Sequence, residues 1–205
     1  MKKEINRKTF YYCVNLKAMG ENRDMLKLNV YTASNGNNLN LSELSVFQRV
    51  MLITDGTLTD ILETYLLEKL CVTKLSEQIL LTTQAIPTLI LNHPCEVIER
   101  KILLQGKESK SNWLYAESTI IPARLEQPFR EALLQSKAPI GKLWMKYKVE
   151  TFKEIITLNW EFAGELADFF GVDKESRLLC RTYRVFSKSQ PIMMITEKFP
   201  DTYFK

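Results

Sequence analysis

The sequence is poor in the residues that build metal centres and disulfide frameworks. Its 205 residues include four Cys and one His, and no two Cys form a CxxC pair. Zinc and iron–sulfur sites need several such ligands at characteristic spacings. We therefore expect no metal, and we interpret Cys13, Cys71, Cys95 and Cys180 as reduced structural thiols.

Glycine-rich loops and long apolar runs are also missing. The seven Gly form no phosphate-binding motif, which argues against a nucleotide cofactor. No apolar run approaches the roughly 20 residues that span a bilayer, and the N-terminal "MKKEINRKTFYYC" lacks the apolar core of a secretory signal. The sequence thus predicts a protein without cofactors, located in the cytoplasm, or in the plastid stroma if it is made there.

Charge of one sign is present only in small excess. The chain has 28 Lys and Arg against 24 Asp and Glu, which gives a net charge of +4. This excess is too small and too dispersed to indicate a nucleic-acid partner, whereas it suits a small anionic ligand. We expect neither nucleic acid nor membrane as a partner, and a monomer or a small homo-oligomer.

The character of the sequence changes near residue 42. Residues 1–41 are polar and rich in Asn, and they include the turn-forming stretch "NGNN". Residues 42–205 carry regular apolar patterns and are enough for one domain. We therefore predict an N-terminal arm, residues 1–41, followed by one folded domain, residues 42–205.

Four segments are predicted as helices. Helical spacing of apolar residues occurs in "SELSVFQRVMLI", which ends at "TDG", and in the next segment, where Thr57 and Asp60 form a capping-box pattern that places Leu58 near an exposed helix N-terminus. "ARLEQPFREALLQSK" and "EFAGELADFFGV" are the other two, the last stopped by Gly171. Between helix and strand, "KAPIGK" is predicted as a loop that exposes the amide of Ile140.

Six segments mix β-branched, aromatic and alternating residues, as strands do. They are "VTKLSEQILLTTQ", "EVIERKILLQ", "NWLYAESTIIP", "VETFKEIITLNWE", "SRLLCRTYRVFS" and "PIMMITEKF". The short connections "GKESKSN" and "SKSQP" favour hairpins and hence antiparallel pairing. The predicted fold class is α+β, with a single six-stranded, mostly antiparallel sheet and flanking helices.

Two strands place a charged residue on an apolar face. In "PIMMITEKF", alternation puts Glu197 with Met193 and Ile195, and in "VIERKILLQ" it puts Arg100 with Ile98. Burying an unpaired charge costs several kcal/mol, so each residue needs a partner or a chemical role. Either the two form a structural ion pair with each other, or Arg100 holds a ligand carboxylate.

Other polar residues are weaker candidates. His93 lies in the predicted turn "NHPC", and no G-x-S-x-G signature accompanies it, so nucleophilic catalysis is not expected. Glu117 could be a second polar group in the pocket, but such a residue is more often paired with Lys or Arg on a neighbouring strand. We interpret Arg181, Arg184 and Lys188 as a solvated strand face.

Five stretches in order resemble one family. "TDGTLTDILE", "ERKILLQG", "YAESTIIPARL", "SKAPIGKLW" and "PIMMITEKFP" are similar to the chorismate pyruvate-lyase (4-hydroxybenzoate synthase) family, in its cyanobacterial, plastid and archaeal branch. The resemblance covers about residues 44–204. It implies the same six-stranded antiparallel sheet, a chorismate lyase-like fold, and a ligand buried between the sheet and helical flaps.

The resemblance also implies a site and a reaction. The family's ligand-contacting arginine and glutamate fall on Arg100 and Glu197, which become the candidate catalytic residues, and its two amide-donating positions fall on Leu58 and Ile140. The implied reaction converts chorismate into 4-hydroxybenzoate and pyruvate without a cofactor, a step that usually feeds synthesis of quinones such as ubiquinone or plastoquinone.

An alternative function comes from a different class. The same fold resembles the effector-binding domains of GntR-type transcription regulators, which sense a small molecule without transforming it. The first forty residues are too short and too weakly helical to supply their DNA-binding domain. A non-catalytic module that binds a small carboxylate therefore stays open beside the lyase.

Overall fold

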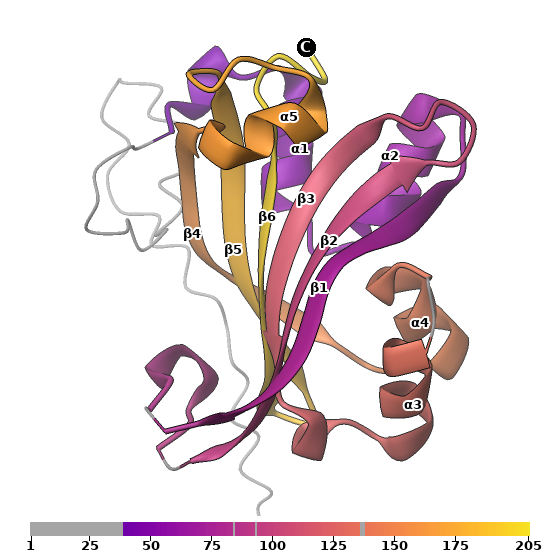
Figure 1. Ribbon diagram of the computed structural model, residues 1–205, viewed down its shortest axis with the longest axis vertical. Helices are drawn as coiled ribbons and strands as arrows, with labels where there is room; N and C mark the ends of the chain where they lie inside the picture. Colours follow the sequence, from indigo (N-terminus) through magenta and orange to yellow (C-terminus); the bar gives the residue numbers. More distant parts are fainter. Residues whose placement is uncertain (1–38, 84, 93, 136–137) are drawn as a thin grey trace, which may run out of the picture.

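A single antiparallel sheet of six strands forms the centre of the protein (Figure 1). The computed structural model describes residues 39–83, 85–92, 94–135 and 138–205. The strands lie in the order β1-β2-β3-β6-β5-β4. Their bounds are β1 Leu70–Thr82, β2 Cys95–Gly106, β3 Asn112–Ile120, β4 Phe152–Phe162, β5 Arg177–Ser187 and β6 Gln190–Pro200. The predicted fold class and all six predicted strands are confirmed.

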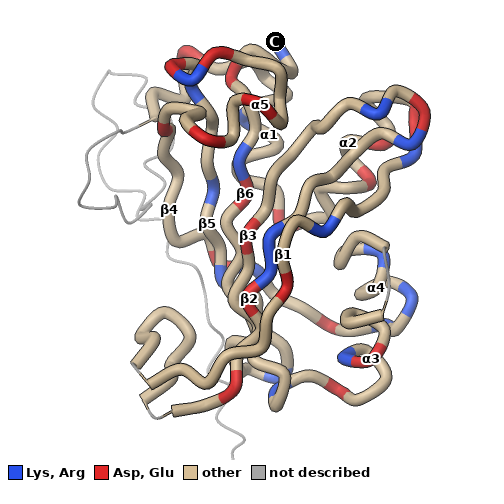
Figure 2. The backbone as a smooth tube through the Cα atoms, viewed as in Figure 1, with Lys and Arg blue, Asp and Glu red and all other residues tan. Residues whose placement is uncertain are grey.

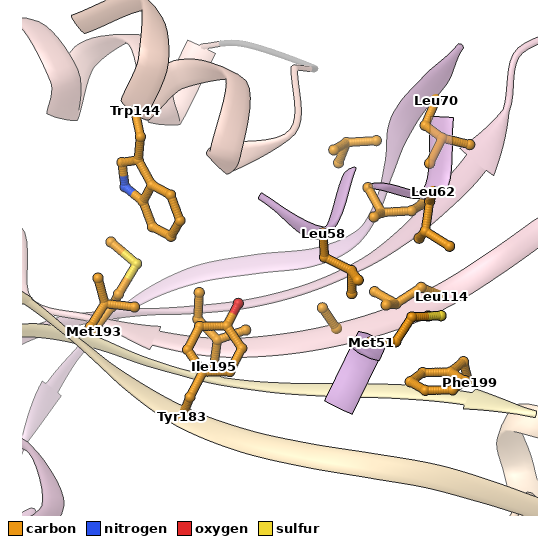
Figure 3. Packing of buried hydrophobic residues seen from close by; sticks show 14 of the residues in the cluster. Met51, Leu58, Leu62, Leu70, Leu114, Trp144, Tyr183, Met193, Ile195 and Phe199 are labelled. Atoms are coloured by element: carbon orange, nitrogen blue, oxygen red, sulfur yellow. The ribbon is translucent and has the colours of Figure 1, made fainter. Parts of the chain in front are cut away.

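The helices divide between the two faces of the sheet. Four helices cover one face, which we call the pocket face. They are α1 Val46–Ile53, α2 Leu58–Leu66, α3 Gln127–Gln135 and α4 Ile140–Tyr147. Their buried residues form one large core with the sheet, in which Trp144 of α4 points toward Met193 and Tyr183 rises from β5 (Figure 3). The short α5, Ala167–Phe170, packs on the opposite face against Tyr115 and Cys180. The pocket face is therefore the more thickly covered one.

Alternation along the strands sets the two faces as predicted. Met193, Ile195 and Phe199 are at most 4% exposed and share the main core, and Glu197 lies on the same face. Central strand β6 pairs with β3 through Ala116 opposite Glu197, and with β5 through Arg181 opposite Glu197. Since residues directly opposite share a face, the sheet register brings Arg181 and Glu197 together.

The side-chain caps of the first two helices differ from the prediction. The capping box lies at Ser45 and Gln48, one turn into the predicted first helix, because each side chain bonds the backbone N–H of the other. Thr57 stands at the N-cap of α2 but makes no side-chain cap hydrogen bond, so the predicted box with Asp60 is wrong. Leu58, predicted near an exposed helix N-terminus, is the first residue of α2, and its side chain is buried.

The stretch "KAPIGK", predicted as a loop, instead leads into α4, whose first residue is Ile140. Pro and Gly usually mark turns, but Pro139 occupies the N-cap, where its missing N–H costs no helical hydrogen bond. A Cβ at Gly141 would lie 2.4 Å from Cγ2 of Thr57. This glycine therefore permits the first turns of α2 and α4 to touch.

The N-terminal boundary and the single His lie largely beyond what the structure covers. Residues 1–38 of the predicted arm, and His93, are outside the described residues. Leu39 and Leu41 pack against the main core, and a short 3-10 helix covers Leu41–Glu43. The division into an arm and a domain stays a prediction.

A buried glutamine connects the first helix to the end of the chain. Gln48 is 2% exposed, and its amide nitrogen donates to the carbonyl oxygens of Asp201, at 2.7 Å, and Tyr203, at 2.9 Å. Ser45 Oγ donates to the carbonyl of Phe204 at 2.6 Å. These bonds fix the tail after β6 against α1.

Replacing Gln48 by Ala should therefore lower the free energy of unfolding by about 2–4 kcal/mol, because it leaves buried carbonyl groups without a donor. Urea denaturation measures the change. Gln78→Ala is the matched control, since Gln78 makes an exposed hydrogen bond to Glu99, and it should cost less than about 0.5 kcal/mol. Equal losses in the two variants would contradict the structural role of Gln48.

Candidate ligand-binding site

A small cavity lies between the sheet and the helices α2 and α4. Its volume is about 60 Å³. The wall formed by β1, β2, β3, β5 and β6 is mostly apolar, and Arg100, Ser118, Tyr183 and Glu197 are its main polar members. Thr59 of α2 and Pro139 and Ile140 at the start of α4 cover it. An apolar cavity with a few convergent polar groups is the usual form of a small-molecule site.

Arg100 brings a spare positive charge into this cavity. The residue is 5% exposed, and its Nε has no hydrogen-bond partner. The nearest carboxylate oxygen, Oε2 of Glu77, is 3.6 Å from that Nε. Burial lowers the pKa of Arg100 and Glu77 partly opposes this effect, but a guanidinium remains charged in proteins. A buried donor of this kind fits an anionic ligand.

Glu197 is held by two neighbours from β5. Arg181 Nε donates to its Oε2 at 2.5 Å, and the Tyr183 hydroxyl donates to its Oε1 at 2.9 Å. Arg181 is 1% exposed and also donates through Nη1 to the carbonyls of Met51, at 2.5 Å, and Thr54, at 3.1 Å. Glu197 is therefore an oriented carboxylate in the wall of the cavity.

The protonation states of Arg181 and Tyr183 are stabilised by the Glu197 carboxylate. Burial alone would lower the pKa of Arg181, but the Glu197 carboxylate beside it raises that pKa above its ordinary value. Burial and the same carboxylate raise the pKa of Tyr183 far above its usual range, so the phenol remains a hydrogen-bond donor. Arg181, Tyr183 and Glu197 thus form one fixed donor–acceptor network.

These contacts contradict one of the two interpretations of the buried charges. Arg100 and Glu197 both line the cavity, but each has a different closest partner, so the proposed structural pair between them is wrong. The prediction that Arg181 belongs to a solvated face is also wrong. The sequence did indicate that Arg181 is buried. It alternates with the core residues Leu179 and Tyr183, as Arg100 does with Ile98 and Ile102.

The N-termini of the two helices that cover the cavity, α2 and α4, lie beside it. Leu58 is the first residue of α2 and Ile140 the first of α4, and neither helix has a side-chain cap. The first N–H groups of a helix have no partner inside it and favour anions. The structure therefore brings the predicted amide positions to two adjoining helix ends, with Ile140 in the cavity wall and Leu58 beside Thr59.

A buried carboxylate ties the two covering helices together. Glu63 of α2 accepts from Lys142 of α4 at 2.5 Å, from Lys69 at 3.0 Å, and from the N–H of Leu70 at 2.9 Å. Burial alone would raise the pKa of Glu63, but these donors, Lys142 foremost, lower it to about 2. This ion pair holds α2 and α4 closed over the cavity.

The remaining candidates lie away from the cavity. Glu117 lies 3.7 Å from Lys198 on the neighbouring strand, so the ordinary paired interpretation holds. Arg184 is bound to Glu154, and Lys188 is mostly exposed beside Glu126. Figure 2 shows basic and acidic residues interspersed along the strands and helices rather than gathered on one element. Within the described residues, no helix is both long and apolar enough to cross a membrane.

Solved structures of low sequence identity share this fold. The effector domain of PhnF from Mycobacterium smegmatis aligns with a TM-score of 0.57 at 9% identity, over 74% of this chain and 92% of that domain. A GntR-family transcriptional regulator from Enterococcus faecalis aligns with a TM-score of 0.50 at 10% identity, over 65% of this chain and 96% of the other. These likenesses show the fold, that of an α+β protein with the architecture of these regulator domains.

Sequence comparison narrows this class to one family. The model of the chorismate pyruvate-lyase Rv2949c-like family matches residues 52–204, and the chain belongs to that family. A chorismate pyruvate-lyase of Mycobacterium leprae is 30% identical over 159 residues, which are 77% of this chain and 75% of that protein. One of Mycobacterium tuberculosis is 35% identical over 111 residues, which are 53% and 55% of the two chains. The predicted family is confirmed.

Arg181→Met should lower the free energy of unfolding by about 3–5 kcal/mol, because it leaves the Glu197 carboxylate buried without its cation. The double variant Arg181→Met with Glu197→Gln should recover part of the loss, since no unpaired charge remains. Urea denaturation measures both. Arg184→Met, on the same strand but the opposite face, should cost about 1 kcal/mol. A double variant no more stable than Arg181→Met would contradict the coupling.

Glu63→Gln should remove a pH-dependent part of the stability. A carboxyl group whose pKa falls from 4.5 to about 2 on folding stabilises the protein fully above pH 4.5, and this contribution is lost as pH falls toward 2. We expect the variant to lose about 2 kcal/mol at pH 7 and to show a flatter stability curve between pH 4.5 and 2. Glu165→Gln, at an exposed carboxylate, is the control. An unchanged slope in Glu63→Gln would disprove the role of the ion pair.

Proposed function

We propose that the protein is a chorismate pyruvate-lyase, which converts chorismate into 4-hydroxybenzoate and pyruvate. The observation that carries the proposal is the cavity with Arg100 and Glu197 on its walls, Arg100 having a buried Nε without a hydrogen-bond partner. Membership of the family and the names of the mycobacterial relatives support the choice of substrate.

In this proposal the ring carboxylate binds at one end of the cavity. Arg100 and the amides of Leu58 and Ile140 neutralise it, with the two helix N-termini adding favourable dipoles. Because the cavity is small and largely apolar, these interactions are stronger than they would be in water. The acid is thereby fixed in one orientation before reaction.

Glu197 is assigned to the opposite end, beside the ring hydroxyl. The reaction breaks the bond between the ring carbon and the enol ether oxygen and removes a proton from the neighbouring ring carbon, which carries the hydroxyl group. The electron pair of that C–H bond completes the aromatic ring. The departing enolpyruvate gains a proton and becomes pyruvate. Aromatisation supplies the driving force, so the residues need only orient the substrate and assist proton transfer.

The contacts of Glu197 support this role, because Arg181 and Tyr183 each bind one of its two oxygens. The carboxylate therefore has a fixed direction, as general acid–base groups require. Arg181 Nη2 is buried without a hydrogen-bond partner, which adds positive potential where negative charge develops on the departing oxygen.

The second candidate is a binding module that leaves its ligand unchanged. The fold shared with the regulators favours it, because the same cavity would serve for sensing as well as for catalysis. Chorismate incubated with purified protein distinguishes the two. Release of 4-hydroxybenzoate and pyruvate in equal amounts supports the lyase, whereas chorismate recovered intact with measurable heat of binding supports the module.

Substitution of the two charged residues tests the assignment. Glu197→Gln should lower kcat by about 100-fold or more, as loss of a general acid–base group does, and Arg100→Met should lower kcat/KM by about 100-fold through weaker carboxylate binding. Product formation followed by absorbance measures both. Glu117→Gln and Arg184→Met change matching residues on the opposite face and should keep activity within about twofold. Full activity in Glu197→Gln would overturn the assignment.

A further inference from the structure

The cations around the cavity are not equivalent. Two of them have close carboxylate partners among the described residues, Arg181 with Glu197 and Lys142 with Glu63. Arg100, 3.6 Å from Glu77, is assigned above to a ligand carboxylate. Lys153 of β4 differs, because no carboxylate oxygen of a described residue lies within 4.0 Å of its ammonium group. Its positive charge is therefore not consumed by an internal ion pair.

Lys153 lies on the pocket face, next to the Glu197 end of the cavity. Its ammonium donates to the carbonyl of Gly56 at 2.5 Å and stands over the rings of Trp144, 5.3 Å from the centroid, and Tyr183, 5.6 Å from the centroid. Tyr183 lines the cavity and donates to Glu197. The ammonium thus contacts a side chain of the cavity wall.

The contacts that hold Lys153 belong largely to the covering elements. Gly56 lies in the turn before α2, and Trp144 lies in α4. The cavity of about 60 Å³ is far smaller than the roughly 300 Å³ of the smallest typical ligand pockets, so a ligand enters only when α2 and α4 move apart. This movement releases the ammonium from Gly56 and Trp144. The flexible four-carbon stem then permits it to reach the ligand.

We propose that Lys153 is a substrate-binding residue that determines specificity, its ammonium binding the second carboxylate of a dicarboxylate ligand at the end of the cavity opposite Arg100. The choice of ligand rests on the proposed function. Chorismate carries one carboxylate on the ring and one on the enol ether side chain, which is attached beside the ring hydroxyl. If Glu197 faces that hydroxyl, the second carboxylate lies on the side of Lys153, whereas 4-hydroxybenzoate has no group there.

The electrostatic surroundings of Lys153 agree with this role. Burial and the nearby Arg181 charge lower the pKa of Lys153 to about 8, while Glu197 and Asp55 oppose the shift, and the Tyr183 ring adjoins it. The group is charged at neutral pH but incompletely satisfied by its neighbours. A ligand carboxylate would restore the missing counter-charge.

Lys153→Met tests the proposal through two ligands that differ by one carboxylate. We expect its KM for chorismate to rise by about 10- to 100-fold, the effect of losing one charge-assisted hydrogen bond. Its Kd for 4-hydroxybenzoate, measured by calorimetry, should change by less than about threefold. Lys153→Arg should recover most of the affinity for chorismate. Lys146→Met, which removes an exposed lysine that stacks on Tyr147 in α4, is the matched control.

A merely structural role would weaken both ligands equally, so a parallel loss of affinity for 4-hydroxybenzoate would overturn the proposal. The pH dependence gives a separate readout. Above about pH 8 the wild-type preference for chorismate over 4-hydroxybenzoate should shrink as Lys153 loses its charge, and Lys153→Arg should keep that preference. A preference that does not change with pH in either protein would contradict the role of the ammonium.

Calorimetry separates this proposal from the proposed function. If wild-type protein binds chorismate without forming product, the lyase assignment fails, but tighter binding of chorismate than of 4-hydroxybenzoate that disappears in Lys153→Met still supports Lys153. If turnover is observed and Lys153→Met has wild-type KM and kcat, the lyase assignment stands and the role of Lys153 is overturned. Equal affinity of the wild type for both ligands also overturns it.

Discussion

The buried ion pair between Arg181 and Glu197 is the interaction on which the site depends most. One guanidinium binds the carboxylate of β6 and also the carbonyl groups of Met51 and Thr54, at the end of α1. Only a short turn separates this end of α1 from Leu58, the first residue of α2. Arg181 therefore fixes the direction of Glu197 and the position of a covering helix at once. Because both charges are removed from water, loss of either is costly, so the geometry is firmly defined.

The two arginines of the pocket face have different main roles: Arg181 stabilises the fold, and Arg100 is available to bind an anion. Arg181 binds a carboxylate through Nε and two carbonyl groups through Nη1, and it stabilises the fold. Arg100 is almost as deeply buried, but its closest carboxylate stands 3.6 Å away and its Nε is unpaired, so its charge is available to an anion. A closer internal partner would stabilise the empty pocket and compete with a ligand. Incomplete pairing of Arg100 is thus the structural condition for binding a carboxylate here.

Period-two alternation was sufficient to predict the sheet and the burial of Arg100 and Glu197, because these depend on local sequence. It could not supply their partners, which come from strand order: Glu197 meets Arg181 only because β5 and β6 pair in that register. The helix at Ile140 was missed because Pro and Gly usually indicate a turn, whereas here Gly141 meets the tertiary demand of contact with Thr57. Such effects of packing between distant segments have no signal in one short stretch of sequence.

The contacts that hold α2 and α4 over the cavity are largely polar, which suits two helices that move apart when a ligand enters. An apolar seal between α2 and α4 would keep water out, but each opening would expose that surface at about 25 cal/mol per Å². The connection instead uses Glu63 with Lys142, whose side chain is 33% exposed, so water can replace the broken contact. The ammonium of Lys153 likewise contacts a carbonyl and two aromatic rings, contacts that water can replace. Opening therefore exchanges polar contacts for hydration, while the apolar core beneath, which includes Leu58 and Leu143, supports both helices.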